Sequence, residues 1–252
     1  MSNRDISSVL RLDRVSLLAN VSSDLLLENI SFEVQSAEII GIIGTSGAGK
    51  TSLLRLLNNL VSPHEGTIYL HNSPVERLMP VQLRRRIVLV NQEPKLLGMR
   101  VIDALSYPLK LQNLSEPEIR TRIDRWSNLL HLPSEWFGKN ELQLSVGQRQ
   151  LIAITRALIV QPEIILLDEP TSALDIGIAN HLLGVLKDLN QSQNLTIMIV
   201  NHQLELIQGF CDRILFLNQG FLEEDVPATK SNWQKFQQKI LQMQTRQEQD
   251  WL

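Results

Sequence analysis

Short apolar runs and segments of helical periodicity alternate along most of this chain. Four runs are dominated by apolar residues, as in strands buried on both faces, and they lie at residues 38–43, 87–90, 163–167 and 195–200. Segments with helical spacing of apolar residues separate these runs, and this alternation predicts a parallel sheet wound with right-handed crossovers. Residues 9–34 and 66–70 have the pattern of short strands joined by polar turns, which predicts a small antiparallel β-region.

The middle and the end of the chain have a different pattern. Between about residues 94 and 160 the apolar positions take helical spacing, which predicts a helical insert. A last helix is predicted at about residues 230–249, with Trp233 and Phe236 on one face. We expect that face to dock on the domain that carries it rather than on a partner.

Composition narrows the class of protein. The chain has 252 residues, of which 43% are hydrophobic, and this suffices for one cored domain over residues 1–252. The net charge of −3 predicts no electrostatic attraction to nucleic acid. A single cysteine, Cys211, excludes a disulfide within the chain and fits a reducing cytosol. No apolar stretch approaches the roughly 20 residues that a membrane helix needs, so we expect a soluble protein that reaches a membrane only through a partner.

The turn after the first apolar run has the pattern of a phosphate loop. Residues 44–51 match G-x-x-x-x-G-K-[ST], with a predicted strand before them and a predicted helix after them. Glycines let the backbone N–H groups and the helix N-terminus point at a nucleotide's phosphates, Lys50 would reach the β- and γ-phosphates, and the Thr51 hydroxyl would bind Mg²⁺. The predicted phosphate-binding residues are Gly44, Thr45, Ser46, Gly47, Ala48, Gly49, Lys50, Thr51 and Ser52.

Two adjacent carboxylates end the third apolar run. Asp168 and Glu169 follow residues 163–167, at the edge where open α/β sheets place their ligands. We expect Asp168 to hold Mg²⁺ through a water and Glu169 to act as the base for the attacking water. Alone, such a pair is often only a solvated charge cluster. The segment of residues 170–175 that follows at once favours the catalytic interpretation.

A third motif separates this chain from other phosphate-loop NTPases. Residues 144–148 read Leu-Ser-Val-Gly-Gln and open a predicted helix. The segment resembles the LSGGQ signature of ATP-binding cassette (ABC) transporters, and the resemblance covers nearly the whole chain. A plain helix-capping box, Ser145 with Gln148, is an alternative that is compatible with phosphate binding.

The resemblance implies a fold and roles for further residues. It implies the α/β P-loop ABC cassette fold, with a RecA-like parallel sheet core, an antiparallel β-region and a helical subdomain at about residues 94–160. It implies that Gln92 senses Mg²⁺ and the γ-phosphate, that His202 contacts the γ-phosphate, and that Asp175 couples two sites across a dimer. It also implies that Ser145, Gly147 and Gln148 bind the ATP held by a second copy of the cassette.

Two departures from the family pattern bear on these roles. Val146 stands where the family usually has glycine, and its branched side chain restricts the backbone. No aromatic residue lies between residues 11 and 31, where family members commonly place one to stack on adenine. Leu17 or Leu18 falls nearest to that place, and an aliphatic contact lacks the π-face that discriminates by stacking.

The function implied is that of an ATP-hydrolysing subunit, with ATP and Mg²⁺ as cofactors. Its partners would be an integral membrane transporter subunit and a second copy of the cassette, on the cytoplasmic face of a membrane. The membrane subunit would dock near Gln92, with Leu96, Leu97, Met99 and Val101 as an apolar floor, although burial inside the cassette explains these residues nearly as well. The alternatives are a soluble ABC ATPase of translation or repair, or a regulatory protein that hydrolyses poorly.

A weaker resemblance bears on the transported molecule. Residues 92–98 and 104–109, together with the short segment before the signature, look most like the compact cassettes of bacterial iron exporters and plant aluminium-tolerance transporters. Cassettes of phosphate and amino-acid importers look similar through the same region. Transported substrate and direction of transport therefore stay open at this point.

Overall fold

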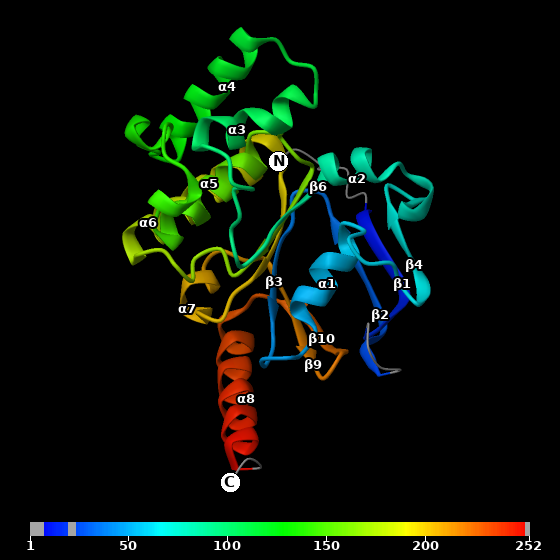
Figure 1. The fold of residues 1–252 in the computed structure, drawn as a ribbon. Helices are drawn as coiled ribbons and strands as arrows, with labels where there is room; N and C mark the ends of the chain where they lie inside the picture. Colours follow the sequence, from blue (N-terminus) through cyan, green and yellow to red (C-terminus); the bar gives the residue numbers. More distant parts are fainter. Residues whose placement is uncertain (1–7, 20–23, 250–252) are drawn as a thin grey trace.

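The fold combines two sheets, with one helix packed between them and further helices outside (Figure 1). The computed structural model describes residues 8–19 and 24–249. The smaller sheet is antiparallel, with strand order β2-β1-β4-β5. Its strands are β1 (Ser8–Leu18), β2 (Leu25–Gln35), β4 (Glu65–Leu70) and β5 (Ser73–Pro74).

The larger sheet positions the candidate site. Its order is β10-β9-β3-β8-β7-β6, and all neighbours are parallel except the antiparallel pair β9 and β10. The strands are β3 (Ile39–Ile43), β6 (Ile87–Val90), β7 (Ile164–Asp168), β8 (Thr196–Val200), β9 (Arg213–Asn218) and β10 (Phe221–Pro227). The carboxyl ends of β3, β6, β7 and β8 meet at one edge of this sheet, so the segments that follow them come together in space.

Helices cover the sheets and form a layer at the top of Figure 1, where α3, α4 and α5 lie. None of the helices in the described part of the chain is long and apolar enough to cross a membrane. The α-helices are α1 (Lys50–Leu57), α2 (Pro80–Arg86), α3 (Val101–Lys110), α4 (Glu116–Leu129), α5 (Val146–Leu158), α6 (Ile176–Gln193), α7 (Leu204–Ile207) and α8 (Lys230–Gln249), and the 3₁₀ turns are η1 (Val75–Arg77), η2 (Ser134–Trp136) and η3 (Glu141–Gln143). These elements confirm the predicted fold class.

The central strands are buried on both faces because two hydrophobic cores enclose them. In β3, Ile39 and Ile43 belong to the core under the helical layer, whereas Ile40 and Ile42 belong to the core between the two sheets. Successive side chains of a strand point to opposite faces, so an uninterrupted apolar run supplies both cores at once.

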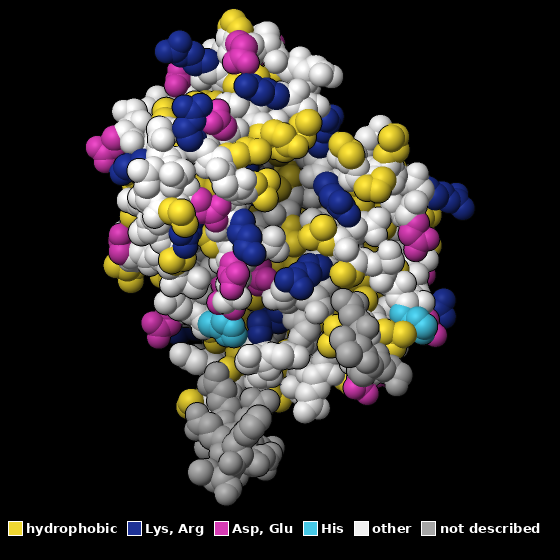
Figure 2. Space-filling model, viewed as in Figure 1, with side chains coloured by type: hydrophobic (Ala, Val, Ile, Leu, Met, Phe, Trp, Pro, Cys, Tyr) yellow, Lys and Arg dark blue, Asp and Glu magenta, His cyan; other side chains and the backbone are white. Residues whose placement is uncertain are grey.

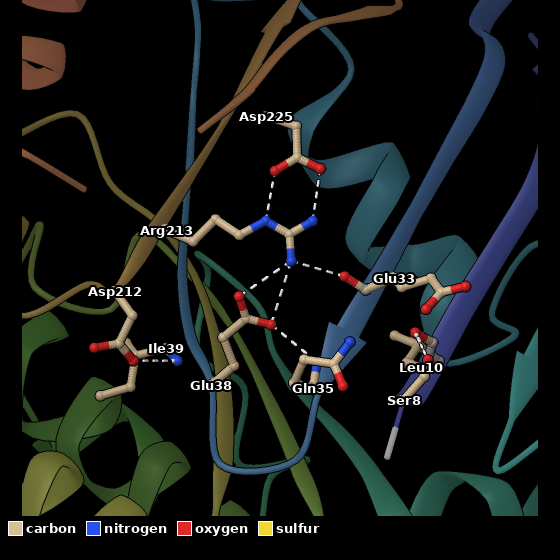
Figure 3. A network of polar contacts seen from close by, with 9 residues as sticks. All are labelled: Ser8, Leu10, Glu33, Gln35, Glu38, Ile39, Asp212, Arg213 and Asp225. Atoms are coloured by element: carbon tan, nitrogen blue, oxygen red, sulfur yellow. Dashed lines mark hydrogen bonds and ion pairs between the residues drawn. The ribbon is translucent and has the colours of Figure 1, made fainter. Parts of the chain in front are cut away.

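An ion-pair cluster joins the two sheets at the ends away from the nucleotide motifs (Figure 3). Arg213 at the start of β9 forms a two-pronged ion pair with Asp225 of β10 and a further one with Glu38. The same guanidinium donates to the backbone oxygen of Glu33 in β2, at 2.8 Å. Hydrogen bonding to Asp225 raises the pKa of Arg213, so the clamp stays charged at any physiological pH.

The C-terminal helix α8 packs on the core through its first half. Trp233 and Phe236 are buried, and Phe236 stacks on Phe216 of β9 with ring centroids 5.0 Å apart. Lys239 forms an ion pair with Glu223 of β10. These contacts fix the helix start against the sheet edge, from which α8 projects in Figure 1.

Candidate functional site

The loop between β3 and α1 is shaped by close backbone approaches. Gly49 has φ +97°, and a Cβ there would lie 2.7 Å from Leu27 Cδ2 and 2.9 Å from the Leu26 oxygen. A Cβ on Gly44 would lie 2.1 Å from the Leu217 oxygen of β9. A side chain at either position would therefore force the loop away from its neighbouring strands.

Lys50 is held inside this loop. Its Nζ donates to the backbone oxygens of Gly44 at 2.9 Å and Thr45 at 2.7 Å, and the residue is buried. Burial lowers the pKa of Lys50, while the charges of Glu169 and Asp168 oppose this. The loop thus holds a cation beside the first turn of α1. Of the other predicted loop residues, Thr45 and Ala48 are buried, Gly49, Thr51 and Ser52 are half-buried, and Ser46 and Gly47 are exposed.

Thr51 and Asp168 meet as predicted for a metal site. The Thr51 hydroxyl donates to Asp168 Oδ2 at 2.8 Å, although the two residues are 117 positions apart. Asp168 ends β7 and is buried, and its Oδ1 has no hydrogen-bond partner. Burial raises the pKa of Asp168, against the Thr51 hydrogen bond. A buried carboxylate oxygen without a partner, beside a hydroxyl, fits a Mg²⁺ ion, which prefers oxygen ligands.

Glu169 lies at the centre of the polar contacts. Its Oε1 is 2.9 Å from His202 Nε2, and its Oε2 accepts a hydrogen bond from Gln92 Nε2 at 3.0 Å. The three side chains come from the ends of β7, β8 and β6, which confirms that the sheet edge brings them together. Glu169 has φ +50°, so its backbone turns sharply after Asp168 and presents the carboxylate to both partners.

Sequence reasoning missed one residue that supports this edge. Asn201, buried between β8 and His202, donates from Nδ2 to Thr171 Oγ1 at 2.8 Å and accepts from the Gln203 backbone N–H at 2.9 Å. These bonds tie the segment carrying His202 to the segment after Glu169. A polar residue directly before His202, at the end of an apolar run, was the available signal.

The signature residues cap their own helix. Ser145 precedes α5, its hydroxyl accepts from the Gln148 backbone N–H at 3.1 Å, and Gln148 Oε1 accepts from the Ser145 N–H at 2.9 Å. The capping box that the sequence allowed is therefore present. Val146 is half exposed, whereas a Cβ on Gly147 would lie 2.4 Å from the Ala173 oxygen. Among the described residues, no hydrogen bond or ion pair found in the structure joins these side chains to the phosphate loop.

Asp175 is likewise a helix cap in this chain. Its Oδ1 accepts from the Ile178 backbone N–H at 2.9 Å, at the start of α6. Ile176 beside it is 71% exposed. Asp175 and Ser145 therefore present two capped helix starts to solvent.

A groove opens beside the phosphate loop, between α1, α2, α3 and α5. It has a volume of about 1190 Å³ and reaches from Asp168 and Gln92 to Leu97 and Tyr107. Figure 2 shows a hollow here, with hydrophobic side chains on its walls and charged side chains below.

The expected apolar floor of this groove is wrong in part. Leu97 is 67% exposed and lines the groove, but Leu96 and Val101 are fully buried in the core and Met99 packs against it. Leu97 has φ +59°, which turns its side chain away from the core that its apolar neighbours enter. Side-chain direction in such a turn is not visible in the hydrophobic pattern.

The place nearest to the expected adenine contact is corrected in part. Leu17 is buried in the core between the two sheets, so it cannot cover a base, whereas Leu18, the other residue predicted there, is half-buried. Leu25 and Leu26 of β2 are each 41% exposed. The Leu26 backbone lies against Gly49 of the phosphate loop, which places these two leucines beside the nucleotide motifs.

Comparisons with known proteins agree on one family. A family model described as "ABC transporter" matches residues 27–172. The methionine import ATP-binding protein MetN of Francisella tularensis subsp. holarctica is 36% identical over 227 residues, which cover 84% of this chain and 65% of the relative. MetN 1 of Bacillus thuringiensis subsp. konkukian is also 36% identical, over 79% of this chain and 60% of the relative. This chain thus spans less than two thirds of the length of these relatives.

Solved structures share the fold. The ATP-binding cassette MJ0796, in a dimeric post-hydrolysis state with ADP and Pi, superposes with a TM-score of 0.81 at 28% identity, over 87% of this chain and 99% of that one. CbiO1 from Clostridium perfringens, described as part of the ABC transporter complex cbiONQ, has a TM-score of 0.78 at 24% identity, over 93% and 92%.

The relatives correct the expected subgroup. The weaker sequence resemblance favoured iron exporters and aluminium-tolerance transporters, whereas these relatives carry the name of methionine import proteins. The stretches on which that resemblance rested, residues 92–98 and 104–109, line the groove and the helix behind it. Apart from Gln92, they hold none of the predicted nucleotide-binding or metal-binding residues, and they are short, so a match there separates subgroups poorly.

Proposed function

This chain belongs to the ABC transporter family, and we propose that it is the ATP-hydrolysing subunit of a transporter, energising solute transport through a separate membrane subunit. The name of the relatives favours import as the direction of transport. For the transported molecule, it favours an amino acid over the substrates of the exporter group.

One observation carries the proposal of hydrolysis. Glu169 is contacted by Gln92 and His202, at 3.0 and 2.9 Å, next to the Thr51–Asp168 pair and the phosphate loop. A carboxylate so placed takes the proton of a water that attacks the γ-phosphate, because two side chains hold it toward the loop. Glu169 is therefore the catalytic base, and His202 and Gln92 are the residues that orient the γ-phosphate and the water.

The rest of the phosphate loop supplies positioning and charge. Residues 44–52 bind the phosphates through backbone N–H groups and the start of α1, and Lys50 leaves its loop carbonyls to meet the β- and γ-phosphates. Thr51, Asp168 and Gln92 would hold Mg²⁺, which would neutralise charge on the phosphate oxygens. Phosphoryl transfer to water demands mainly these two contributions.

A second copy completes the site. Ser145, Gly147 and Gln148 lie at an outward-facing helix start, which favours an anion, and no side chain in the described part of their own chain supplies one. We assign this end of α5 to the γ-phosphate of ATP on a second cassette, with Asp175 coupling the two sites. The dimeric state of the MJ0796 cassette supports this assembly.

The membrane subunit docks in the groove beside Gln92. Exposed apolar side chains, including Leu97, Tyr107 and Leu111, line it together with Arg84, Arg85 and Arg156. A short amphipathic segment of the partner would cover the apolar part and leave its polar face to the arginines. Docking of this kind places the chain at the cytoplasmic face of a membrane.

Glu169→Gln tests the proposed hydrolysis. The variant should still bind ATP but hydrolyse it about 10²- to 10⁴-fold more slowly, the usual contribution of a positioned base. Single-turnover hydrolysis and calorimetric ATP binding measure the two effects. Glu205→Gln, an exposed carboxylate change on nearby α7, should leave the rate unchanged. Lys50→Ala should lose binding itself. Near-normal turnover by Glu169→Gln would overturn the proposal.

A further inference from the structure

The segment of residues 95–98, which follows Gln92, is hydrogen-bonded on two sides by residues just before the signature and within α5. Glu141 Oε2 accepts hydrogen bonds from the backbone N–H groups of Leu96 at 3.1 Å and Gly98 at 3.3 Å. Arg156 of α5 donates to the backbone oxygen of Lys95 at 3.1 Å. The Glu141 carboxylate thus binds backbone N–H groups of residues 95–98, and the Arg156 guanidinium binds a backbone carbonyl of the same segment.

The backbone of this segment is shaped for the acid. Leu97 has φ +59° and Gly98 has φ +71°, so two successive residues adopt left-handed conformations. Such turns aim N–H groups into one concavity that favours an anion. Here the anion is a side chain of the same protein, and the Leu97 side chain is left exposed on the groove.

Glu141 also connects directly to the signature helix. It is the first residue of η3, which leads into Leu144 and Ser145. Its backbone oxygen accepts from the Leu144 N–H at 3.4 Å and from Arg149 Nη1 of α5 at 3.4 Å. A displacement of the Glu141 side chain therefore reaches the start of α5 through two bonds of the same residue.

A paired strip keeps the two segments moving together. Arg100 and Asn140 form a β-bridge, and two further backbone bonds run from Val101 N–H to the Lys139 oxygen at 3.0 Å and from Ile102 N–H to the Phe137 oxygen at 3.1 Å. Glu141 lies at the end of this strip that is nearest to the signature. The strip resists sliding, so force on residues 95–98 passes through Glu141 rather than being absorbed by a loop.

We propose that Glu141 is a positioning residue that links the membrane-docking segment, residues 95–98, to Ser145 and the signature helix. The inference rests on the proposed function, because it needs ATP between two cassettes and a partner in the groove. Closure of the dimer on ATP at the signature would then shift residues 95–98, and docking of the membrane subunit on residues 95–98 would shift the signature. This route is separate from Gln92, which contacts Glu169 in the hydrolytic site.

The test uses hydrogen exchange by mass spectrometry on peptides covering residues 94–100, in full-length Glu169→Gln protein with and without ATP. In the parent, ATP-driven dimerisation should slow exchange in these peptides at least about threefold. Adding Glu141→Ala should speed basal exchange there roughly five- to tenfold, since two amides lose their acceptor, and should abolish the response to ATP.

Two matched variants separate linkage from general damage. Leu142→Ala, in the same 3₁₀ turn and 93% exposed, should keep the response. Glu141→Gln retains an oxygen that accepts from both amides, so it should restore the response of the segment. Light scattering on the same samples reports the dimer.

Each outcome decides something. A dimer that forms in Glu141→Ala with the ATP response intact overturns the inference and leaves the proposed function standing, because the response then travels through Gln92. If Leu142→Ala also loses the slowing of exchange by ATP, the inference is overturned, because any change in this turn would then have the same effect. Absence of an ATP-dependent dimer in the parent overturns the proposed assembly, and the inference falls with it.

Discussion

The two halves of the nucleotide chemistry differ in how complete they are within one chain. At the edge of the parallel sheet, Thr51 already contacts Asp168, and Glu169 already contacts Gln92 and His202. At the start of α5, the hydrogen bonds of the Ser145 and Gln148 side chains found in the described part of the chain run only between these two residues. The first set comes from segments far apart in the sequence, and the second from four consecutive residues.

This difference follows from the contacts that fix each set of residues in place. The sheet edge is fixed by two cores, so the side chains that we propose as catalytic are positioned before any nucleotide arrives. The signature is ordered by its own capping box, and its outer face is left free. One region therefore behaves as a preformed site and the other as a surface awaiting a ligand from outside the chain.

The largest effect is expected from Ser145→Asp. Aspartate is as good a helix cap as serine, so α5 should stay folded. Its carboxylate would face the γ-phosphate of the second cassette and repel it. In the Glu169→Gln background, the ATP-dependent dimer should weaken on the order of a hundredfold or more, a change that sedimentation equilibrium measures. ATP affinity of the monomer should not change.

A second variant at the same position tests whether Ser145 faces the phosphate of a second cassette. Ser145→Arg should abolish the dimer too, by bulk, but it also removes the cap. If Ser145→Asp dimerises normally while Ser145→Arg does not, the serine serves only its own helix, and the contrast between the two regions disappears.

The next largest effect is expected from Gly147→Ala. Its Cβ would lie 2.4 Å from the Ala173 oxygen, so the segment before Asp175 must move. Overpacking of this kind costs about 1–3 kcal/mol in free energy of unfolding. Chemical denaturation measures it. Gly184→Ala in α6 is the matched control, because nothing lies within 4 Å of a Cβ there, and it should stabilise the protein by about 0.5–1 kcal/mol. Equal stabilities of the two variants would show that Gly147 is free of its own chain.

The sequence predicted the preformed region better than the outward one. Strand ends meet at one edge of a parallel sheet by topology, so Asp168, Glu169, Gln92 and His202 could be grouped from apolar runs and the residues that follow them. The phosphate loop needed only its own pattern and context. Roles in binding and hydrolysis stay predictions, because they depend on a nucleotide and on a second copy.

The misses have a common physical reason. Leu96, Leu97, Met99 and Val101 look alike as a pattern, yet one left-handed residue sends Leu97 outward while its neighbours stay in the core. Leu17 was misplaced because side-chain direction in a bulged strand depends on register, and β1 has several register shifts. The contact between Gly147 and Ala173 depends on tertiary approach, which no local pattern reports.

A smaller effect is expected from Val146→Gly, which makes the outward region more like the usual family signature. Val146 is half exposed at the first position of α5. Removing its side chain should let the helix start approach a phosphate more closely, and tighten the ATP-dependent dimer up to about tenfold in the Glu169→Gln background. Stability should fall by about 0.5–1 kcal/mol, the helix cost of glycine. An unchanged or weaker dimer would show that Val146 does not limit closure.

The smallest effect concerns the base, where the preformed region has its one departure from the family pattern. No aromatic residue lies between residues 11 and 31, and Leu25 and Leu26 are exposed beside the phosphate loop. Lacking a stacking contact of about 1 kcal/mol, the protein should bind GTP within roughly tenfold of ATP. Leu26→Tyr should tighten ATP binding several-fold, measured by calorimetry in the Glu169→Gln background, whereas Leu25→Tyr is the neighbouring control. Strong discrimination against GTP by the unmodified chain would mean that a residue elsewhere already reads the base, and Leu26→Tyr should then change nothing.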